Sequence, residues 1–446
     1  MKWDLDSVAA TIGGVAVGTA TITSVVIDSR RAAPGALFVA LRGKAADGHE
    51  FVTAAFAAGA AAALVEPGRL PEGAAGVETA DPLTALAALG ARRRTELSAP
   101  VVAVTGSTGK TTTKDLIAAA VGPGAYAAPS SYNNEIGVPL TVLACPDDAV
   151  ALVVEVGSRG LGHIAALGGV IRPDVAVITN VGPAHLEMFG DIDTVRRAKW
   201  ELVAALSPQG VAVLPVADPV LLTMRRGPMI TFGEDPSADV AAQDVTVDPR
   251  GRASFTMLHA GKRAHIVLAA AGRHQPTNAA AAVAAALALG VDFAEAAGRL
   301  SGVRLSPWRM EVVERSVLGG TVLVVNDAYN ANPASMESAL TTVAAMPGRH
   351  VAVLGMMHEL GAASPALHEE VGRRAAALGF MVVVVGEDPG IARGAGTAVV
   401  AAVGDLVEAA EAVADRLRPG DVVLVKASRA TGLERLPELI GGGAAA

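Results

Sequence analysis

The sequence lacks several features that would assign it to common protein classes. It has one cysteine, Cys145, so it cannot form an internal disulfide, and nothing indicates metal–thiolate chemistry. No apolar run approaches the roughly 18–20 residues that a membrane helix needs. The longest candidate, Ala279–Leu289, is mostly alanine and predicts a packed helix.

Charge and the N-terminal sequence exclude further classes. Lysine and arginine residues are dispersed and the net charge is −8, which argues against nucleic acid as a partner. The opening residues MKWDLD contain acids and no apolar signal core. We therefore expect a soluble, cytoplasmic protein without membrane insertion, and we expect a monomer.

A glycine-rich segment, TGSTGKTTTK at Thr105–Lys114, directly follows the apolar run Val101–Val104. A β-branched strand, a glycine turn, Lys-Thr and a helix in this order are typical of a loop that holds the phosphates of a nucleoside triphosphate. Backbone N–H groups point at phosphate oxygens, Lys110 adds a positive charge, and the Thr111 hydroxyl can reach Mg²⁺. The general motif has another glycine where this chain has Val104, so the loop is a shortened variant. A glycine turn beside a surface lysine is the alternative.

The length of 446 residues and the order of apolar runs predict an α/β chain of three domains. Residues 1–98 form a small α/β domain, with strands at Val25–Ile27 and Ala36–Leu41, a helix near Phe51–Ala58 and a linker at Arg92–Pro100. Residues 99–308 form a central parallel-sheet ATPase domain with the phosphate loop (P-loop). It has strands at Leu152–Val156, Val175–Thr179 and Val211–Leu214, a helix near Thr194–Leu206 and a small antiparallel insert at Asp239–Leu268.

The last block, 309–446, repeats the α/β alternation and predicts a Rossmann-like domain. Its five expected strands are Thr321–Val325, His350–Leu354, Phe380–Val385, Ala398–Ala401 and Val422–Val425. The first of these strands is not followed by G-x-G-x-x-G, so a dinucleotide is not the expected ligand.

Four polar residues of the central domain are candidates for chemistry. Glu155 ends a strand, where a carboxylate is well placed for Mg²⁺, although it could simply cap a turn. His185, in NVGPAHLEMFG, follows the next strand, and an ordinary loop histidine is the alternative. Lys199 lies on a helix, and the sequence alone favours a solvated surface charge. Asn278 could cap an alanine-rich helix or offer its amide to a base edge.

Ten strings along the chain together resemble the Mur ligases, the ATP-dependent amide-bond-forming enzymes of peptidoglycan synthesis. They are IDSRRAAPGALFVALRGKAADGHEF, TGSTGKTTTK, SSYNNEIGVPLTVL, VVEVGSRG, NVGPAHLEMFG, AKWEL, GRHQPTN, NDAYNANPASM, LGMMHELG and VKASR. The first string and NDAYNANP are similar to the branch of the family that joins D-alanyl-D-alanine to UDP-N-acetylmuramoyl-tripeptide.

The resemblance implies two small-molecule substrates, UDP-MurNAc-tripeptide and D-Ala-D-Ala, with ATP and two Mg²⁺ ions as cofactors. It implies an acyl-phosphate intermediate, catalytic roles for Lys110, Lys199 and His185, and closure of the last domain to assemble the site. For ATP the implied residues are Thr105, Gly106, Ser107, Thr108, Gly109, Lys110, Thr111, Thr112, Asn278, Arg309 and Asp327.

The same resemblance implies the remaining ligands. The metal ligands would be Thr111, Glu155, His185 and Lys199, the last as a CO₂-derived carbamate. The substrate contacts would be Ser29, Arg30, Asp47, Gly48 and His49 for the UDP-sugar, Asn133 and Asn134 for the peptide, and Tyr329, Asn330, Asn332, Lys426, Ser428 and Arg429 for the dipeptide.

This chain departs from the family pattern at three positions. Met356 stands where the family usually has an acid in LGDM-x-ELG, so we assign that position no catalytic role. Ala427 replaces a common glycine, and Trp200 after Lys199 is unusual.

Other functions remain open at this stage. They are a sister ligase that adds a different amino acid, folylpolyglutamate synthetase, a GTPase-like switch and an inactive homologue. The identity of the third residue of the tripeptide, meso-diaminopimelate or lysine, is also open.

Overall fold

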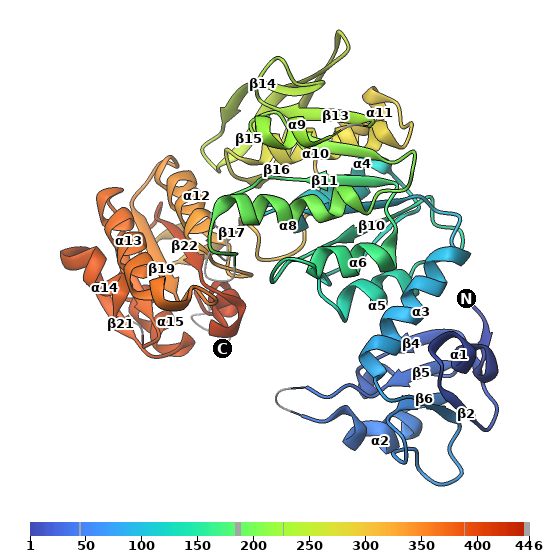
Figure 1. Cartoon of the computed structure of the whole chain (residues 1–446). Coiled ribbons are helices and arrows are strands. Elements are labelled where there is room, and N and C mark those ends of the chain that lie inside the picture. Colours follow the sequence, from blue (N-terminus) through green and yellow to red (C-terminus); the bar gives the residue numbers. More distant parts are fainter. Residues whose placement is uncertain (44–45, 183–188, 226, 388, 441–446) are drawn as a thin grey trace. The chain divides into compact units, whose positions relative to one another are not determined.

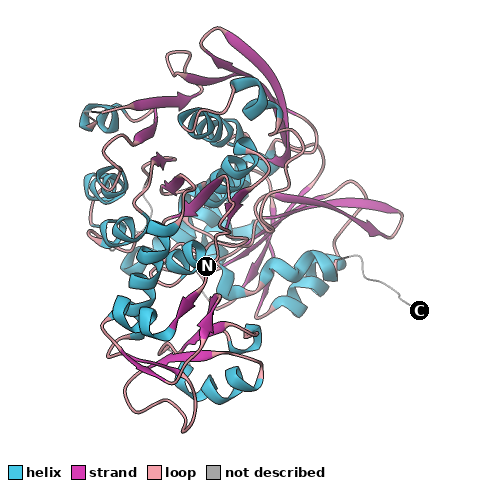
Figure 2. Ribbon diagram, turned by 90° about the vertical axis from the view of Figure 1, so that its right-hand side faces the viewer, coloured by secondary structure: helices cyan, strands magenta, loops and turns pink. Residues whose placement is uncertain are grey.

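The computed structural model describes residues 1–43, 46–182, 189–225, 227–387 and 389–440. The chain divides into two compact units. The first comprises Met1–Thr105, Val121–Val177 and Ala198–Ala212, and the second comprises the remainder. The architecture is α/β throughout, and helices lie against the strands of each sheet (Figure 1, Figure 2).

The N-terminal part is built around a five-stranded sheet in the order β2-β7-β6-β5-β4. Strands β4 to β7 pair in parallel, whereas β2 is antiparallel to β7. A separate pair, β1 and β3, is antiparallel. The elements are β1 (Trp3–Asp4), α1 (Leu5–Ile12), β2 (Val15–Val17), β3 (Thr21–Ile22), β4 (Ser24–Val26), η1 (Ser29–Arg31), β5 (Ala36–Val39), η2 (Gly48–Phe51), α2 (Val52–Ala57), β6 (Ala62–Val65), β7 (Gly76–Glu78) and α3 (Pro82–Glu96).

Strict alternation of side chains divides the core of this sheet into two layers. Leu37 and Val39 of β5 pack on one face with Trp3 and Leu86, whereas Phe38 packs on the other face. Successive residues of a strand point to opposite faces, so an uninterrupted apolar run predicts a strand buried on both sides.

The segment Arg92–Pro100 is not simply a linker, because α3 continues to Glu96. Its arginines hold the helix to neighbouring backbone. Arg93 Nη2 donates to the Cys145 carbonyl at 2.7 Å, and Arg94 Nε donates to the Ile171 carbonyl at 2.8 Å. The charge cluster therefore anchors the end of a helix, and residues 92–96 are helical.

A nine-stranded sheet has the order β16-β15-β14-β13-β12-β11-β8-β10-β9. Its elements are β8 (Val101–Thr105), α4 (Lys110–Val121), β9 (Ala125–Ala127), α5 (Gly137–Leu143), β10 (Ala151–Glu155), α6 (His163–Ile171), β11 (Val175–Ile178), α8 (Ile192–Ala204), β12 (Val211–Pro215), α9 (Pro219–Met224), β13 (Met229–Gly233), β14 (Val240–Val247), β15 (Arg252–His259), β16 (Lys262–Ala271), α10 (Gln275–Ala288) and α11 (Phe293–Gly298).

The strand order reverses at β8, because β9 and β10 lie to one side of it and β11 to the other. Ligands bind at such a switch point, outside the carboxyl ends of the strands, and the glycine-rich loop begins there. The expected antiparallel insert is present as β14, β15 and β16. These strands extend the main sheet, since β14 pairs in parallel with β13.

The C-terminal part has a six-stranded sheet in the order β17-β18-β22-β19-β20-β21, parallel except for the β17–β18 pair. Its elements are β17 (Glu311–Val317), β18 (Gly320–Asn326), α12 (Pro333–Ala344), β19 (His350–Gly355), η3 (Gly361–Ala363), α13 (Ser364–Ala377), β20 (Met381–Val385), α14 (Gly390–Ala395), η4 (Gly396–Ala398), β21 (Val399–Val403), α15 (Leu406–Ala414), β22 (Val422–Lys426), η5 (Arg429–Thr431), η6 (Leu433–Arg435) and α16 (Leu436–Leu439).

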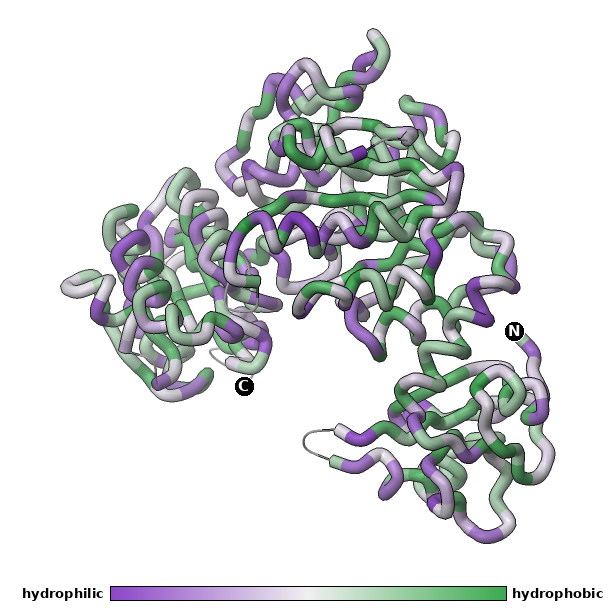
Figure 3. Tube along the Cα trace, in the orientation of Figure 1, coloured by the Kyte–Doolittle hydropathy of each residue, from purple (hydrophilic) through white to green (hydrophobic). Residues whose placement is uncertain are grey.

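All five strands expected here are confirmed, and β17 is an additional one. Hydrophobic residues are concentrated along the buried strands (Figure 3). Among the described residues, no helix is both long and apolar enough to cross a bilayer.

Candidate active site

The glycine-rich loop connects β8 to α4, and its two glycines adopt conformations that other residues disfavour. Gly106 has φ 151° and Gly109 has φ 78°. A Cβ atom on Gly106 would overlap the Thr179 hydroxyl, and one on Gly109 would lie 2.7 Å from Asn278 Oδ1. The loop therefore needs glycine at both positions for close approach as well as for its backbone angles.

Lys110 is the first residue of α4 and reaches back over the loop. Its Nζ donates to the Gly106 carbonyl at 2.9 Å and lies 3.5 Å from the Ser107 carbonyl oxygen. The following hydroxyl, on Thr111, belongs to a side chain that is 2% exposed. The positive charge, the hydroxyl and the helix N-terminus thus lie together, as binding of phosphate requires.

Asn180, two residues beyond the end of β11, positions this loop and was not predicted from the sequence. Its Oδ1 accepts from the Thr108 amide at 3.1 Å, and its Nδ2 donates to the Thr108 hydroxyl at 2.9 Å. Its carbonyl accepts from the Ser107 amide at 3.1 Å. An asparagine shortly after a strand that neighbours the loop strand was the available signal.

Glu155 ends β10 as a buried carboxylate, 3% exposed, in register with Val104 of β8. It accepts from Ser131 Oγ at 2.9 and 3.0 Å and from Asn133 Nδ2 at 2.7 Å. Asn133, which the resemblance places at the peptide, thus bonds to the candidate metal ligand. Asn134 Oδ1 accepts from the amides of Ile136 and Gly137 and so shapes the start of α5.

The Lys199 side chain is 3% exposed. The prediction of a solvated surface lysine, which its sequence alone favours, is therefore wrong. Lys199 shares the buried face of α8 with Val195, Leu202 and Val203. The Lys199 side chain is therefore withdrawn from bulk water. Trp200 beside it is half-buried. His185 lies outside the described residues.

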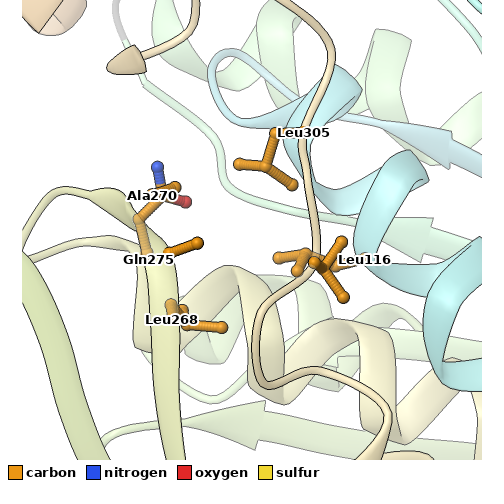
Figure 4. A pocket seen from close by; sticks show the side chains of 7 residues that line it. Leu116, Leu268, Ala270, Gln275 and Leu305 are labelled. Atoms are coloured by element: carbon orange, nitrogen blue, oxygen red, sulfur yellow. The ribbon is translucent and has the colours of Figure 1, made fainter. Parts of the chain in front are cut away.

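Asn278 lies in the first turn of α10 and does not cap it, because the helix begins at Gln275. Its Nδ2 donates to Gln275 Oε1 at 3.0 Å. Gln275 also lines a small hollow, together with Leu116 of α4, Leu268 of β16 and Leu305 (Figure 4). Leucine and alanine residues lie around it, beside the Gln275 side chain.

Residues of the C-terminal part form a stack of guanidinium groups and aromatic rings. The Arg309 guanidinium lies 4.1 Å from the centre of the Tyr329 ring, and that of Arg429 lies 4.1 Å from the Trp308 ring and 5.8 Å from Tyr329. Trp308 and Met310 have positive φ angles of 62° and 53°. The strained segment thus fixes both arginines at one place.

Asp327 and Lys426 form an ion pair with Oδ2–Nζ at 2.5 Å, and the Lys426 side chain is 1% exposed. Lys426 Nζ also donates to the Asn330 carbonyl at 2.9 Å, and the Met310 amide donates to Asp327 Oδ1 at 3.1 Å. Breaking a buried pair of this kind costs about 3–5 kcal/mol because one charge is left uncompensated. Lys426, expected to face the dipeptide, therefore also positions Asp327.

Further expected C-terminal residues have local structural contacts. Asn332 caps α12, where its Oδ1 accepts from the Ser335 amide at 2.9 Å. Ser428 Oγ accepts from the His358 amide at 3.0 Å, and its own amide donates to the Met356 carbonyl at 2.9 Å. Met356 packs near Gly386, and Ala427 is fully buried.

His274 links the start of α10 to α12, because its Nδ1 lies 2.9 Å from Ser338 Oγ. The pKa of His274 lies below its ordinary value. The surrounding protein desolvates the imidazolium, and the charge of Lys426 lowers the pKa further, whereas Asp327 raises it.

A pH-dependent stability follows from this histidine. Its pKa is depressed in the folded state, so the unfolded chain binds more protons, and stability falls as the pH drops below the unfolded pKa of about 6.5. The thermal unfolding midpoint should fall between pH 7.5 and pH 5.5, and His274→Asn should reduce that fall. An equal pH dependence in the variant would contradict this assignment.

Two of the N-terminal residues expected to contact a UDP-sugar, Asp47 and His49, belong to a polar network in the first unit. His49 Nδ1 lies 2.6 Å from Asp47 Oδ1, and His49 Nε2 accepts from the Glu66 amide at 3.1 Å. The histidine therefore carries its proton on Nδ1. Arg42 bonds to Asp47 at 3.1 Å and to Glu66.

Gly48 allows a close approach of backbone in this network, because a Cβ there would lie 2.6 Å from Leu41 N and O. Ser29 begins η1, and Arg30 is strongly exposed. Hydrogen bonds from the Arg30 side chain and amide lower the pKa of Asp28 to about 2.

Three family models match the chain, one each in its N-terminal, central and C-terminal parts. Residues 21–94 match the model described as "Mur ligase family, catalytic domain", 104–286 match "Mur ligase middle domain", and 308–429 match "Mur ligase, glutamate ligase domain". A UDP-N-acetylmuramoyl-tripeptide–D-alanyl-D-alanine ligase of Mycobacterium tuberculosis is 38% identical, over 92% of this chain and 90% of the relative.

Two solved structures are also similar. MurF from Acinetobacter baumannii has a TM-score of 0.87 and 31% identity, with 98% of each chain covered. MurF ligase from Thermotoga maritima in complex with ADP has a TM-score of 0.81 and 31% identity, covering 94% of this chain and 97% of that one.

Proposed function

Because the chain belongs to the Mur ligase family, we propose that it is an ATP-dependent ligase that joins D-alanyl-D-alanine to UDP-N-acetylmuramoyl-tripeptide in peptidoglycan synthesis. The glycine-rich loop carries this proposal, because Lys110 and two conformationally required glycines lie at the carboxyl end of β8. We place the reaction in the cytoplasm, where ATP and nucleotide-linked precursors are available.

The reaction needs an activated carboxylate. A carboxylate oxygen of the tripeptide attacks the γ-phosphorus of ATP, ADP leaves, and an acyl phosphate forms. The amine of the dipeptide then attacks the acyl carbon, phosphate leaves with the C–O bonding pair, and the amine loses a proton. Lys110 and the amides of the loop stabilise negative charge on the transferred group.

The donors present suit magnesium, which takes oxygen ligands from one or two carboxylates together with substrate phosphates. Glu155 and the Thr111 hydroxyl are such donors, and both are buried. Among the described residues, no three His, Cys, Asp or Glu side chains form a metal-binding group, so further ligands would come from phosphate and water. Bound magnesium would screen the negative charges of the substrates. His185 remains the proposed ligand of a second ion.

The remaining roles extend the family resemblance to single residues. We propose that Asn278 contacts adenine, and that Arg309 and Asp327 contact the nucleotide from the C-terminal domain. Tyr329, Asn330 and Arg429 would contact the dipeptide, and the Asp47–His49 network with Ser29 and Arg30 would contact the UDP-sugar. The domains proposed for these roles are 1–98, 99–308 and 309–446, and the active protein is a monomer.

A phosphate-release assay tests the function directly. Release should require ATP, UDP-MurNAc-tripeptide and D-Ala-D-Ala together. Release that does not depend on the dipeptide would indicate a nucleotidase or a switch, and no release at all would indicate an inactive homologue.

A carbamate on Lys199 predicts dependence on CO₂. The buried position of the side chain supports this modification, which would turn a cation into an oxygen ligand. In CO₂-depleted buffer the rate should fall several-fold and return when bicarbonate is added. A carbamate carbon should appear in the NMR spectrum with carbon-13 bicarbonate and be absent in Lys199→Met. A rate indifferent to CO₂ would contradict the proposal.

A further inference from the structure

A charged cluster in the first unit has no role so far. Arg159 Nη1 donates to Glu135 Oε1 at 2.9 Å, and His163 Nε2 lies 3.4 Å from Glu135 Oε2. The Arg159 amide donates to His163 Nδ1 at 3.1 Å, so a neutral His163 directs its Nε2–H toward Glu135. The Arg159 and Glu135 side chains are 57% and 38% exposed, so a ligand can reach both.

Backbone geometry places this cluster close to Glu155. The Gly157 amide donates to the Asn133 carbonyl at 2.7 Å, and Asn133 Nδ2 bonds to Glu155. Glu135 is two residues beyond Asn133, and Arg159 is two residues beyond Gly157. Two residues span at most about 7 Å, so both charged groups lie within a short reach of the proposed reaction centre.

Glu135 is suited to bind a cation. Burial raises the pKa of its carboxyl, but its backbone hydrogen bond and the Arg159 guanidinium outweigh this effect and hold it below the ordinary value. The group is therefore ionised at neutral pH. Its Oε1 atom accepts from Arg159, and its Oε2 atom lies 3.4 Å from His163 Nε2.

The proposed function, on which this inference rests, places the third residue of the tripeptide here. Its carboxylate is the group that reacts, so its side chain must begin beside Glu155. A side chain that carries its polar end four or five bonds away reaches roughly 6 Å further, given carbon–carbon bonds near 1.5 Å.

We propose that Arg159 and Glu135 recognise a third residue whose side chain ends in both an ammonium and a carboxylate, as in meso-diaminopimelate, in preference to lysine. The guanidinium binds the distal carboxylate, and Glu135 binds the distal ammonium. Lysine supplies only the ammonium. An exposed ion pair stabilises a protein by only about 0–1 kcal/mol. Breaking the Arg159–Glu135 pair so that each side chain can bind the ligand therefore costs little free energy.

The experiment measures kcat and KM with the two UDP-muramoyl-tripeptides for the full-length wild type and three variants. The wild type should prefer the diaminopimelate peptide by about ten-fold in kcat/KM, the scale of one charge-assisted contact. Arg159→Gln should reduce that preference to about two-fold, mainly through KM. Glu135→Gln should weaken both peptides, since both carry the ammonium. Arg374→Gln, in an exposed pair with Glu337, is the matched control.

Equal losses for the two peptides in Arg159→Gln would show that the pair only supports its loop, and this result would overturn the inference. A wild type that does not discriminate, or that prefers lysine, would also overturn it. Should dipeptide-dependent phosphate release fail with both peptides, the proposed function fails instead. In that case the Kd of each UDP-peptide is measured by calorimetry. A Kd about ten-fold lower for the diaminopimelate peptide would support the inference, and equal or absent binding would overturn it.

Discussion

Replacing Lys110 with alanine is expected to reduce dipeptide-dependent phosphate release by about 10³-fold, the upper range for loss of one preorganised donor to a developing charge. Lys110 Nζ lies over the loop, 2.9 Å from the Gly106 carbonyl, so its charge is held where the transferred phosphoryl group must pass. The loss should be in kcat as well as in ATP affinity, because charge on that group grows in the transition state.

Lys262→Ala is the matched control for this variant. Lys262 is an exposed lysine on β16 that pairs with Asp292 at 3.1 Å, and its loss should change the rate by less than about two-fold. Both proteins should be compared by circular dichroism and by initial rates at saturating ATP. Undiminished peptide joining by the Lys110 variant would refute phosphoryl activation at this loop.

The second large effect is expected from Glu155→Gln, which keeps the shape of the side chain and removes its charge. Phosphate release should fall by about 10²-fold, and more Mg²⁺ should be needed for half-maximal rate, because an amide is a weaker ligand for a hard cation. Ser131 and Asn133 hold the carboxylate in place, so the defect should not arise from disorder of the side chain.

A magnesium titration of the wild type, Glu155→Gln and Glu337→Gln checks this prediction. Glu337 is a half-exposed carboxylate on α12, paired with Arg374, and its variant should follow the wild-type curve. An unchanged magnesium requirement in Glu155→Gln would remove Glu155 from the proposed ligands.

Buried parallel strands were predictable from the sequence because both of their faces are apolar. Val101–Val104, Leu152–Val156 and Val422–Val425 fall within one or two residues of β8, β10 and β22. Strand β17 was missed because it is a half-exposed antiparallel edge, in which Glu311 and Glu314 interrupt the apolar pattern. The helical end of α3 was missed because its arginines bind distant carbonyls, which a local charge pattern does not reveal.

The candidate site was predictable from the sequence where the local backbone conformation requires particular residues. The glycine loop is one such case, since backbone angles and close approaches fix its glycines. The burial of Lys199 was not predictable from its own segment, because RRAKWELV reads as a charged helix and only tertiary packing covers one face. The roles of Asn180 and Lys426 depend on hydrogen bonds to residues more than 70 positions away. Such long-range contacts cannot be predicted from the spacing of residues in the sequence.

One contact of α4 connects the glycine loop to a later segment of the chain. Asp115 Oδ2 accepts from the Ser306 amide at 2.7 Å, and Ser306 is three residues before Arg309. Lys110 and Asp115 lie on the same helix, little more than one turn apart. Movement of that helix on binding of a triphosphate would reach the segment that leads into the Arg309 stack through this hydrogen bond. We therefore expect nucleotide binding to be coupled to the position of Arg309.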